Sequence, residues 1–222
     1  MLEITTLSEL TIDGKLSLGP GMSSKDLFAF YGEDLRVWFH GERARHDAIM
    51  VGAGTVRSDD PELTVRYTSG ANPLRVVPAS EGRLPLDARL LNDGHPTLVA
   101  VSDRASGAAV EALAAKPGVE VVRCGVDRVD LAALAALLEA RGVRSLMAEG
   151  GSRLLHGLFA AGLVSKIVIK HIPVISGAPE APTFLSSEPA TSLPLSRWRL
   201  DDWFVKSGVG VSVYRPLGEA GA

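Results

Sequence analysis

The feature that most constrains the fold is a series of short apolar runs, separated from one another by turns and helical patterns. Runs of this length are typical of strands that are buried on both faces of a parallel sheet. The helical patterns between them are bounded by capping residues, glycine or proline. This alternation predicts an α/β fold with helices on both faces of a mostly parallel sheet. The predicted strands are residues 47–51, 73–77, 97–101, 119–123 and 144–148, and the predicted helices are 108–115, 130–141 and 152–162, with Ser152 as the cap of the last.

The two ends of the chain add strands of other kinds. Residues 3–11 and 164–174 are predicted to be longer strands. Residues 198–206 and 209–215 alternate with period two around Ser207-Gly208, which predicts an antiparallel hairpin. The sheet is therefore expected to be mixed, and we expect one domain over residues 1–222.

Two further segments are less regular. Ser24 is predicted to cap a helix with apolar residues at helical spacing, interrupted at Gly32 and Gly41. Residues 179–194 contain four prolines and are predicted to form a surface loop.

Composition excludes several classes of partner. The net charge of −3 and the charged fraction of 22% show no basic excess, so we expect no nucleic-acid partner. No apolar run is long enough to span a bilayer, so no membrane partner is expected either. The single cysteine, Cys124, cannot form an internal disulfide, and the chain begins without a signal peptide pattern. We therefore expect a cytoplasmic protein.

The segment from Arg43 to Arg66 carries the first candidate site. A buried strand ends in Gly52-Ala53-Gly54-Thr55, and Asp59-Asp60 follows. The carboxyl ends of strands in open α/β sheets bind ligands, and glycines expose backbone N–H groups there. Either arginine could hold a phosphate, although a solvated surface charge is the more common role of an arginine.

A second candidate site begins where the strand 144–148 ends. Glu149-Gly150-Gly151 leads into a helix at Ser152, and helix N-termini attract phosphate. A tight turn with no ligand is the equally weighted alternative for this motif alone, and neither glycine motif completes the G-x-G-x-x-G pattern. Two glycine-ended strands in one sheet favour a dinucleotide. Glu149 would face the same crevice and could contact a substrate amine or a developing cation.

No metal site is predicted. The histidines show no ligand spacing, and no carboxylate or histidine cluster accompanies Asp59-Asp60, for which loop capping is the simpler role.

At these segments the chain resembles the reductase domain of bacterial and archaeal riboflavin biosynthesis, which has a dihydrofolate-reductase-like fold. The matching stretches occur in the family's order and cover most of the chain: 12–15, 43–44, 51–66, 72–77, 149–151 and 162–164. The resemblance implies a three-layer α/β/α domain, here in the freestanding form without a deaminase domain, and a homodimer. It also implies NADPH-dependent reduction of a phosphoribosylamino-pyrimidine to its ribitylamino product, with hydride delivered to C1 of the open-chain sugar imine.

The resemblance also implies a role for each matching residue. Glu149 is expected to be catalytic and to contact substrate. The residues expected to bind NADPH are Gly52, Gly54, Thr55, Asp59, Ser102, Gly150, Gly151, Ser152, Arg153 and Leu154. Those expected to bind the phosphorylated substrate are Ser23 (or its neighbour Ser24), Arg43, Leu63, Arg66 and Glu149, with the arginines on the 5′-phosphate.

The chain departs from the family pattern mainly in its first strand. Leu7 stands where many members have a polar or cationic residue that contacts substrate, and Glu9 lies four residues before Asp13. Ser80 and its neighbours follow the strand 73–77 where an aspartate is usual. Two alternatives therefore stay open: an NADPH-dependent reductase of another pteridine-like or pyrimidine-like substrate, and a non-catalytic nucleotide-binding module.

Overall fold

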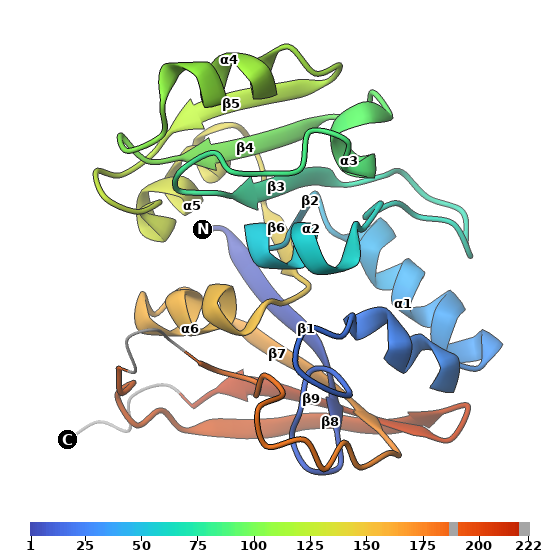
Figure 1. The fold of residues 1–222 in the computed structure, drawn as a ribbon. Helices are drawn as coiled ribbons and strands as arrows, with labels where there is room; N and C mark the ends of the chain where they lie inside the picture. Colours follow the sequence, from blue (N-terminus) through green and yellow to red (C-terminus); the bar gives the residue numbers. More distant parts are fainter. Residues whose placement is uncertain (187–190, 218–222) are drawn as a thin grey trace.

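A mixed sheet forms the centre of the molecule (Figure 1). The computed structural model describes residues 1–186 and 191–217, and nine strands of that part of the chain join in one sheet. The strands are β1 (Glu3–Thr11), β2 (Ala48–Met50), β3 (Leu74–Pro78), β4 (Thr97–Val101), β5 (Val119–Arg123), β6 (Ser145–Ala148), β7 (Lys166–Ile172), β8 (Trp198–Lys206) and β9 (Val209–Pro216).

The order of the strands across the sheet is β5-β4-β3-β2-β6-β1-β7-β9-β8. Every neighbouring pair from β5 to β7 is parallel, whereas β9 runs antiparallel to both β7 and β8. In Figure 1 the β8–β9 hairpin closes the edge of the sheet opposite β5. The predicted mixed sheet with a C-terminal antiparallel hairpin is confirmed.

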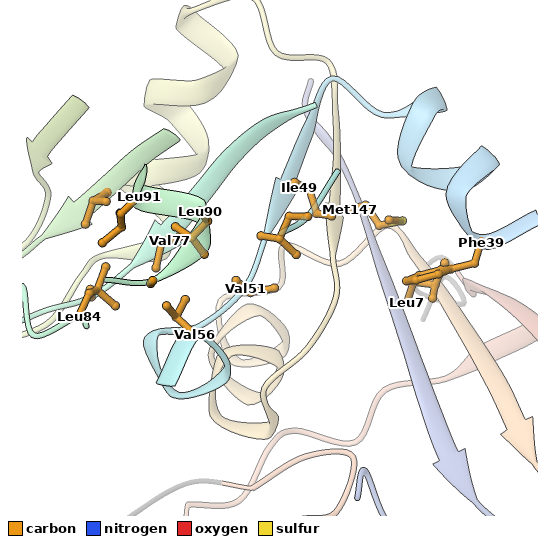
Figure 2. Packing of buried hydrophobic residues seen from close by; sticks show 14 of the residues in the cluster. Leu7, Phe39, Ile49, Val51, Val56, Val77, Leu84, Leu90, Leu91 and Met147 are labelled. Atoms are coloured by element: carbon orange, nitrogen blue, oxygen red, sulfur yellow. The ribbon is translucent and has the colours of Figure 1, made fainter. Parts of the chain in front are cut away.

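Helices cover both faces of this sheet. They are the 3₁₀ helix η1 (Ser24–Phe30) and the α-helices α1 (Glu33–Arg45), α2 (Ala53–Asp59), α3 (Arg89–Asn92), α4 (Gly107–Ala114), α5 (Leu131–Ala140) and α6 (Ser152–Ala160). One buried cluster joins the sheet to η1 and α1–α4, and Figure 2 shows some of its strand residues, such as Ile49 and Met147, and helical residues, such as Val56 and Phe39. A second cluster joins the other face to α5 and α6 through Leu134 and Leu155. The three-layer α/β/α architecture is confirmed.

Five local features differ from the sequence predictions. Helix α2 was not predicted, because Val56 is its only buried apolar residue and leaves no helical periodicity. The four-residue helix α3 was also missed. Gly41 does not interrupt α1, since its position leaves room on all sides and the burial of Leu35 and Phe39 outweighs a cost of about 1 kcal/mol for a helical glycine.

At two helices the N-cap lies one residue before the serine that was predicted to be the cap. Ser23, not Ser24, caps η1, because its hydroxyl accepts a hydrogen bond from the Lys25 N–H. Gly151, not Ser152, is the residue before α6, and the Ser152 hydroxyl donates to the Thr183 carbonyl at 2.6 Å instead.

The proline-rich segment 179–194 has no helix or strand where it is described, and its residues 187–190 lie outside the described residues. Its Thr183 forms an isolated antiparallel bridge with Lys15. Within residues 1–186 and 191–217, each helix is too short or too polar to cross a membrane.

Candidate active site

The two glycine motifs meet at one end of the sheet. β2 and β6 are parallel neighbours, with Met50 opposite Ala148, so the turns that follow them lie side by side. The Glu149 N–H donates to the Met50 carbonyl at 3.0 Å and fixes the second turn against the first. A cleft of about 1280 Å³ opens beyond these strand ends and is lined by both turns. The prediction that the two motifs share one crevice is confirmed.

The glycines of the second turn are required by its backbone. Gly150 has φ of 105° and Gly151 has φ of 85°, values that disfavour any residue with a Cβ. A Cβ on Gly151 would also lie 3.0 Å from the Thr55 hydroxyl of α2. The turn therefore packs closely against α2 and presents its backbone to the cleft.

The carboxylates of Asp59 and Asp60 have different environments. Asp59 lines the cleft, and its Oδ2 accepts a 2.8 Å hydrogen bond from the Ser24 hydroxyl. Its Oδ1 is buried and has no hydrogen-bond partner among the described residues. Asp60 ends α2 in the left-handed conformation and accepts from the Arg89 N–H, which is the loop-capping role. Within residues 1–186 and 191–217, no group of three or more His, Cys, Asp or Glu is arranged to hold a metal ion.

Glu149 is held in the cleft wall by a buried arginine. Both its oxygens accept from the Arg43 guanidinium at 2.6 Å, and the side chains are 9% and 6% exposed. The guanidinium also donates to the Thr64 carbonyl and lies 4.6 Å from the centre of the Phe39 ring. Burial opposes the charge of Arg43, but the contact with Glu149 outweighs burial and raises the pKa of Arg43. Arg43 therefore fixes the position of the Glu149 carboxylate in the cleft wall.

A second carboxylate of the cleft wall, Glu9, has its own buried cation. The Lys170 ammonium is fully buried, lies 2.8 Å from Glu9 Oε2 and sits 3.8 Å from the centre of the Phe39 ring. The Tyr31 hydroxyl donates to the same oxygen at 3.3 Å. Burial lowers the pKa of Lys170, while Glu9 opposes that shift. Burial and then the charge of Glu9 raise the pKa of Tyr31.

The opposite end of the cleft is basic. Exposed arginines from three segments line it, together with Ser80 and Glu81, which follow β3: they are Arg57, Arg83 and Arg128. Arg57 donates to the Arg83 carbonyl, and Arg83 pairs with Glu81. Sequence reasoning missed these arginines and also Lys170. A lysine inside the apolar run of β7 was a usable signal for the latter, whereas the arginines lie in segments whose meeting depends on the fold.

Most of the predicted site residues line this cleft. Those that do are Gly52, Gly54, Thr55, Asp59, Glu149, Gly150, Gly151, Ser152, Arg153 and Leu154. Those outside the lining are Ser23, Arg43, Leu63, Arg66 and Ser102. Of these five, Arg43 reaches the site through its ion pair with Glu149.

The other four lie behind or beside the cleft. Leu63 is buried in the core at a positive φ of 55°. Ser102 is fully buried, and its hydroxyl donates to the carbonyl of Ser80, which does line the cleft. Arg66 is partly exposed and pairs with Glu62. The Ser23 side chain caps η1, and its neighbour Ser24 lines the cleft.

Known proteins resemble this chain in sequence and in fold. A family model described as the RibD C-terminal domain matches residues 3–208. A protein of Aquifex aeolicus named 2,5-diamino-6-ribosylamino-4(3H)-pyrimidinone 5′-phosphate reductase is 40% identical over 205 residues, which are 91% of each chain.

Solved structures share the fold at lower identity. The crystal structure of a pyrimidine reductase-like protein from Corynebacterium diphtheriae has a TM-score of 0.81 and 18% identity, and the match covers 98% of this chain and 93% of that one. A diaminohydroxyphosphoribosylaminopyrimidine deaminase/5-amino-6-(5-phosphoribosylamino)uracil reductase from Thermotoga maritima has a TM-score of 0.76 and 23% identity, over 97% of this chain and 57% of its own.

Proposed function

The chain belongs to the RibD C-terminal domain family, and from that membership we propose that it reduces a ribosylaminopyrimidine 5′-phosphate to the ribitylamino product with NADPH. The observation that carries the proposal is the make-up of the cleft. One end has glycine turns, helix N-termini and arginines, and the other has two carboxylates fixed by buried cations. The end with glycine turns and arginines suits a dinucleotide. The end with two carboxylates suits a nitrogen-rich ring and a cationic reaction centre.

The cofactor end fits NADPH on three features. The backbone of Gly150-Gly151 is open to the cleft, and α6 begins directly after it, so N–H donors are available for a pyrophosphate. The buried, unpartnered Oδ1 of Asp59 calls for a donor from a ligand. Arg57, Arg83 and Arg128 supply positive charge for a 2′-phosphate, which favours NADPH over NADH. Bound NADPH would supply the hydride.

The position of Glu149 in the cleft supports a catalytic role at the reacting carbon. It lies between the glycine turn and Glu9 in the cleft lining, and Arg43 holds both its oxygens. A fixed carboxylate near C1 of the sugar stabilises the positive charge of a protonated imine and thereby favours hydride addition. Because Arg43 is engaged by Glu149, we assign the 5′-phosphate to Arg66, whose side chain is 42% exposed and can exchange Glu62 for a phosphate.

We also propose a homodimer. Three apolar side chains of the edge strand β8 are more than half exposed: Leu200, Trp203 and Val205. An exposed apolar edge strand is a ready surface for a second copy of the chain.

Initial rates of NADPH oxidation test the proposed activity. The protein should oxidise NADPH only when a ribosylaminopyrimidine 5′-phosphate is present, and NADH should be a poorer donor. Arg66→Ala should raise the KM for the pyrimidine about tenfold or more while leaving the KM for NADPH unchanged.

The control is Arg89→Ala, because Arg89 is also an exposed partner of Glu62. Its second partner is Asp60 after α2, whereas Arg66 donates to Thr64, whose carbonyl accepts from Arg43. Its kinetics should equal those of the unaltered protein. Absence of pyrimidine-dependent NADPH oxidation would refute the proposed function, and equal rises in both KM values would refute only the role of Arg66.

A further inference from the structure

Glu9 and Lys170 form a charged pair inside the sheet. They are register partners on the parallel strands β1 and β7 and lie on the sheet face that α1 covers through Phe39. Lys170 is fully buried and makes no well-directed hydrogen bond among the described residues, and Glu9 is the one carboxylate there within 4 Å of its ammonium. A buried ion pair rarely stabilises a fold more than apolar residues would, so stability alone does not account for this one.

The free side of the Glu9 carboxylate belongs to the cleft. Oε2 faces Lys170 and the Tyr31 hydroxyl, whereas no hydrogen bond to Oε1 is present in the described part of the chain. The side chain is 13% exposed, and the residue lines the cleft. With Oε2 occupied by these two groups, Oε1 is the carboxylate oxygen left to accept a hydrogen bond. A ligand that reaches it must bring an N–H or O–H donor.

Two candidate pyrimidines differ at the position where a donor matters. The 2,5-diamino-4(3H)-pyrimidinone ring carries a 2-amino group beside N3–H, which places two donors next to each other. The corresponding aminouracil carries a carbonyl oxygen at position 2. A carboxylate oxygen accepts a hydrogen bond from the 2-amino group but is repelled by a carbonyl oxygen at position 2. A site built to hydrogen-bond one substrate group strongly rejects an analogue that lacks it.

We propose that Glu9, held by Lys170, contacts position 2 of the pyrimidine ring and makes the enzyme specific for the 2-amino-pyrimidinone over the aminouracil. This inference rests on the proposed function, because it assumes that a ribosylaminopyrimidine occupies the cleft. Glu9 is then a specificity-determining residue, and Lys170 is a positioning residue that acts by holding the Glu9 carboxylate.

The role of Lys170 has its own signature. The charged and titratable groups around Glu9 are Lys170, Tyr31, Arg43 and Glu149. In Lys170→Met the Glu9 carboxylate loses the cation that lies 2.8 Å from its Oε2 and is no longer held on that side. The KM for the diaminopyrimidinone should therefore rise, while the KM for NADPH should stay unchanged. A purely structural role of Lys170 would change both KM values or neither.

The test is the ratio of kcat/KM for the two pyrimidines, measured with NADPH side by side. The unaltered protein should favour the diaminopyrimidinone by about a hundredfold or more, and Glu9→Gln should lower that ratio at least about tenfold, since an amide can donate or accept. Glu120→Gln is the control. Glu120 is an exposed carboxylate of β5 that is paired with Arg141 and lies outside the cleft lining. Its ratio should not change.

Glu9→Gln leaves Lys170 unpaired, so the thermal unfolding of this variant is measured as well. If Glu9→Gln does not fold, the neutral double variant Glu9→Gln/Lys170→Met is used in its place. The same fall in the ratio is expected. A preference of the unaltered protein for the aminouracil overturns the inference, as does a ratio that Glu9→Gln and the double variant leave unchanged. Activity on neither pyrimidine refutes the proposed function itself.

Discussion

Four charged side chains at the end of the cleft near β1 and β6 form two pairs, and this constrains which substitutions the site tolerates. Arg43 pairs with Glu149, Lys170 pairs with Glu9, and both cations lie against the Phe39 ring. Removing one member of such a pair leaves a buried charge without compensation and costs about 3–5 kcal/mol. Removing both members together costs much less. Double variants therefore separate the chemical role of these residues from their effect on folding.

His40 predicts how stability depends on pH. It is buried beside Arg43, and its Nδ1 accepts from the Arg66 N–H, so the ring is neutral. Burial and then the charges of Arg43 and Arg66 lower the pKa of His40 to about 3. Below pH ~6.5 the unfolded chain binds a proton at this histidine that the folded state does not bind. The free energy of unfolding therefore falls by about 1.4 kcal/mol for each unit by which the pH is lowered.

Urea unfolding at pH 7 and pH 5.5 measures this effect. The unaltered protein should lose about 1 kcal/mol more over this interval than His40→Asn, whose amide oxygen can take the place of Nδ1. Equal losses in the two proteins would show that His40 is protonated in the folded state as readily as in the unfolded chain.

At the scale of elements, the sequence predicted what local patterns determine. The apolar runs of β2 and β6 end in glycines, and both turns lie where two parallel strands end. The partners of the charged residues were not predictable in this way. Arg43 was expected on a phosphate but lies against Glu149, and Lys170 was not considered. Both pairings depend on strand order and register, which nothing local in the sequence specifies.

The Gly150-Gly151 turn gives a prediction for one element. Gly151→Ala places a methyl group 3.0 Å from the Thr55 hydroxyl and strains a backbone with φ of 85°. We expect the KM for NADPH to rise about tenfold or more, because the turn must move from α2 and from the cofactor end of the cleft. Initial rates with varied NADPH measure the change.

Gly162→Ala is the matched control. Gly162 also has a positive φ, at 65°, but a Cβ there meets nothing within 4 Å, and the residue follows α6 at its other end. Both variants should lose about 1–2 kcal/mol of stability from backbone strain. If the two variants have the same KM for NADPH, the turn does not contact the cofactor.

At the scale of the whole molecule, strand order determines the direction of the cleft. Glu9 on β1 and Glu149 after β6 mark one end, in the middle of the sheet, while Ser80 after β3 and Arg128 after β5 mark the other. Ligands of open α/β sheets bind beyond the carboxyl ends of the strands, and this cleft runs along those ends. We therefore expect the pyrimidine to bind near β1 and the adenosine part of NADPH to bind toward β3–β5.

The proposed reaction transfers hydride from NADPH to C1 of the ribosyl group within this cleft. The most direct test uses NADPH with deuterium at C4 of the nicotinamide, prepared as each stereoisomer, and locates the label in the product by mass spectrometry and NMR. We expect one ribitylamino product per NADPH oxidised, with deuterium at C1 of the former ribose from one of the two stereoisomers. Deuterium on the pyrimidine ring, or NADPH oxidation without a ribitylamino product, would contradict it.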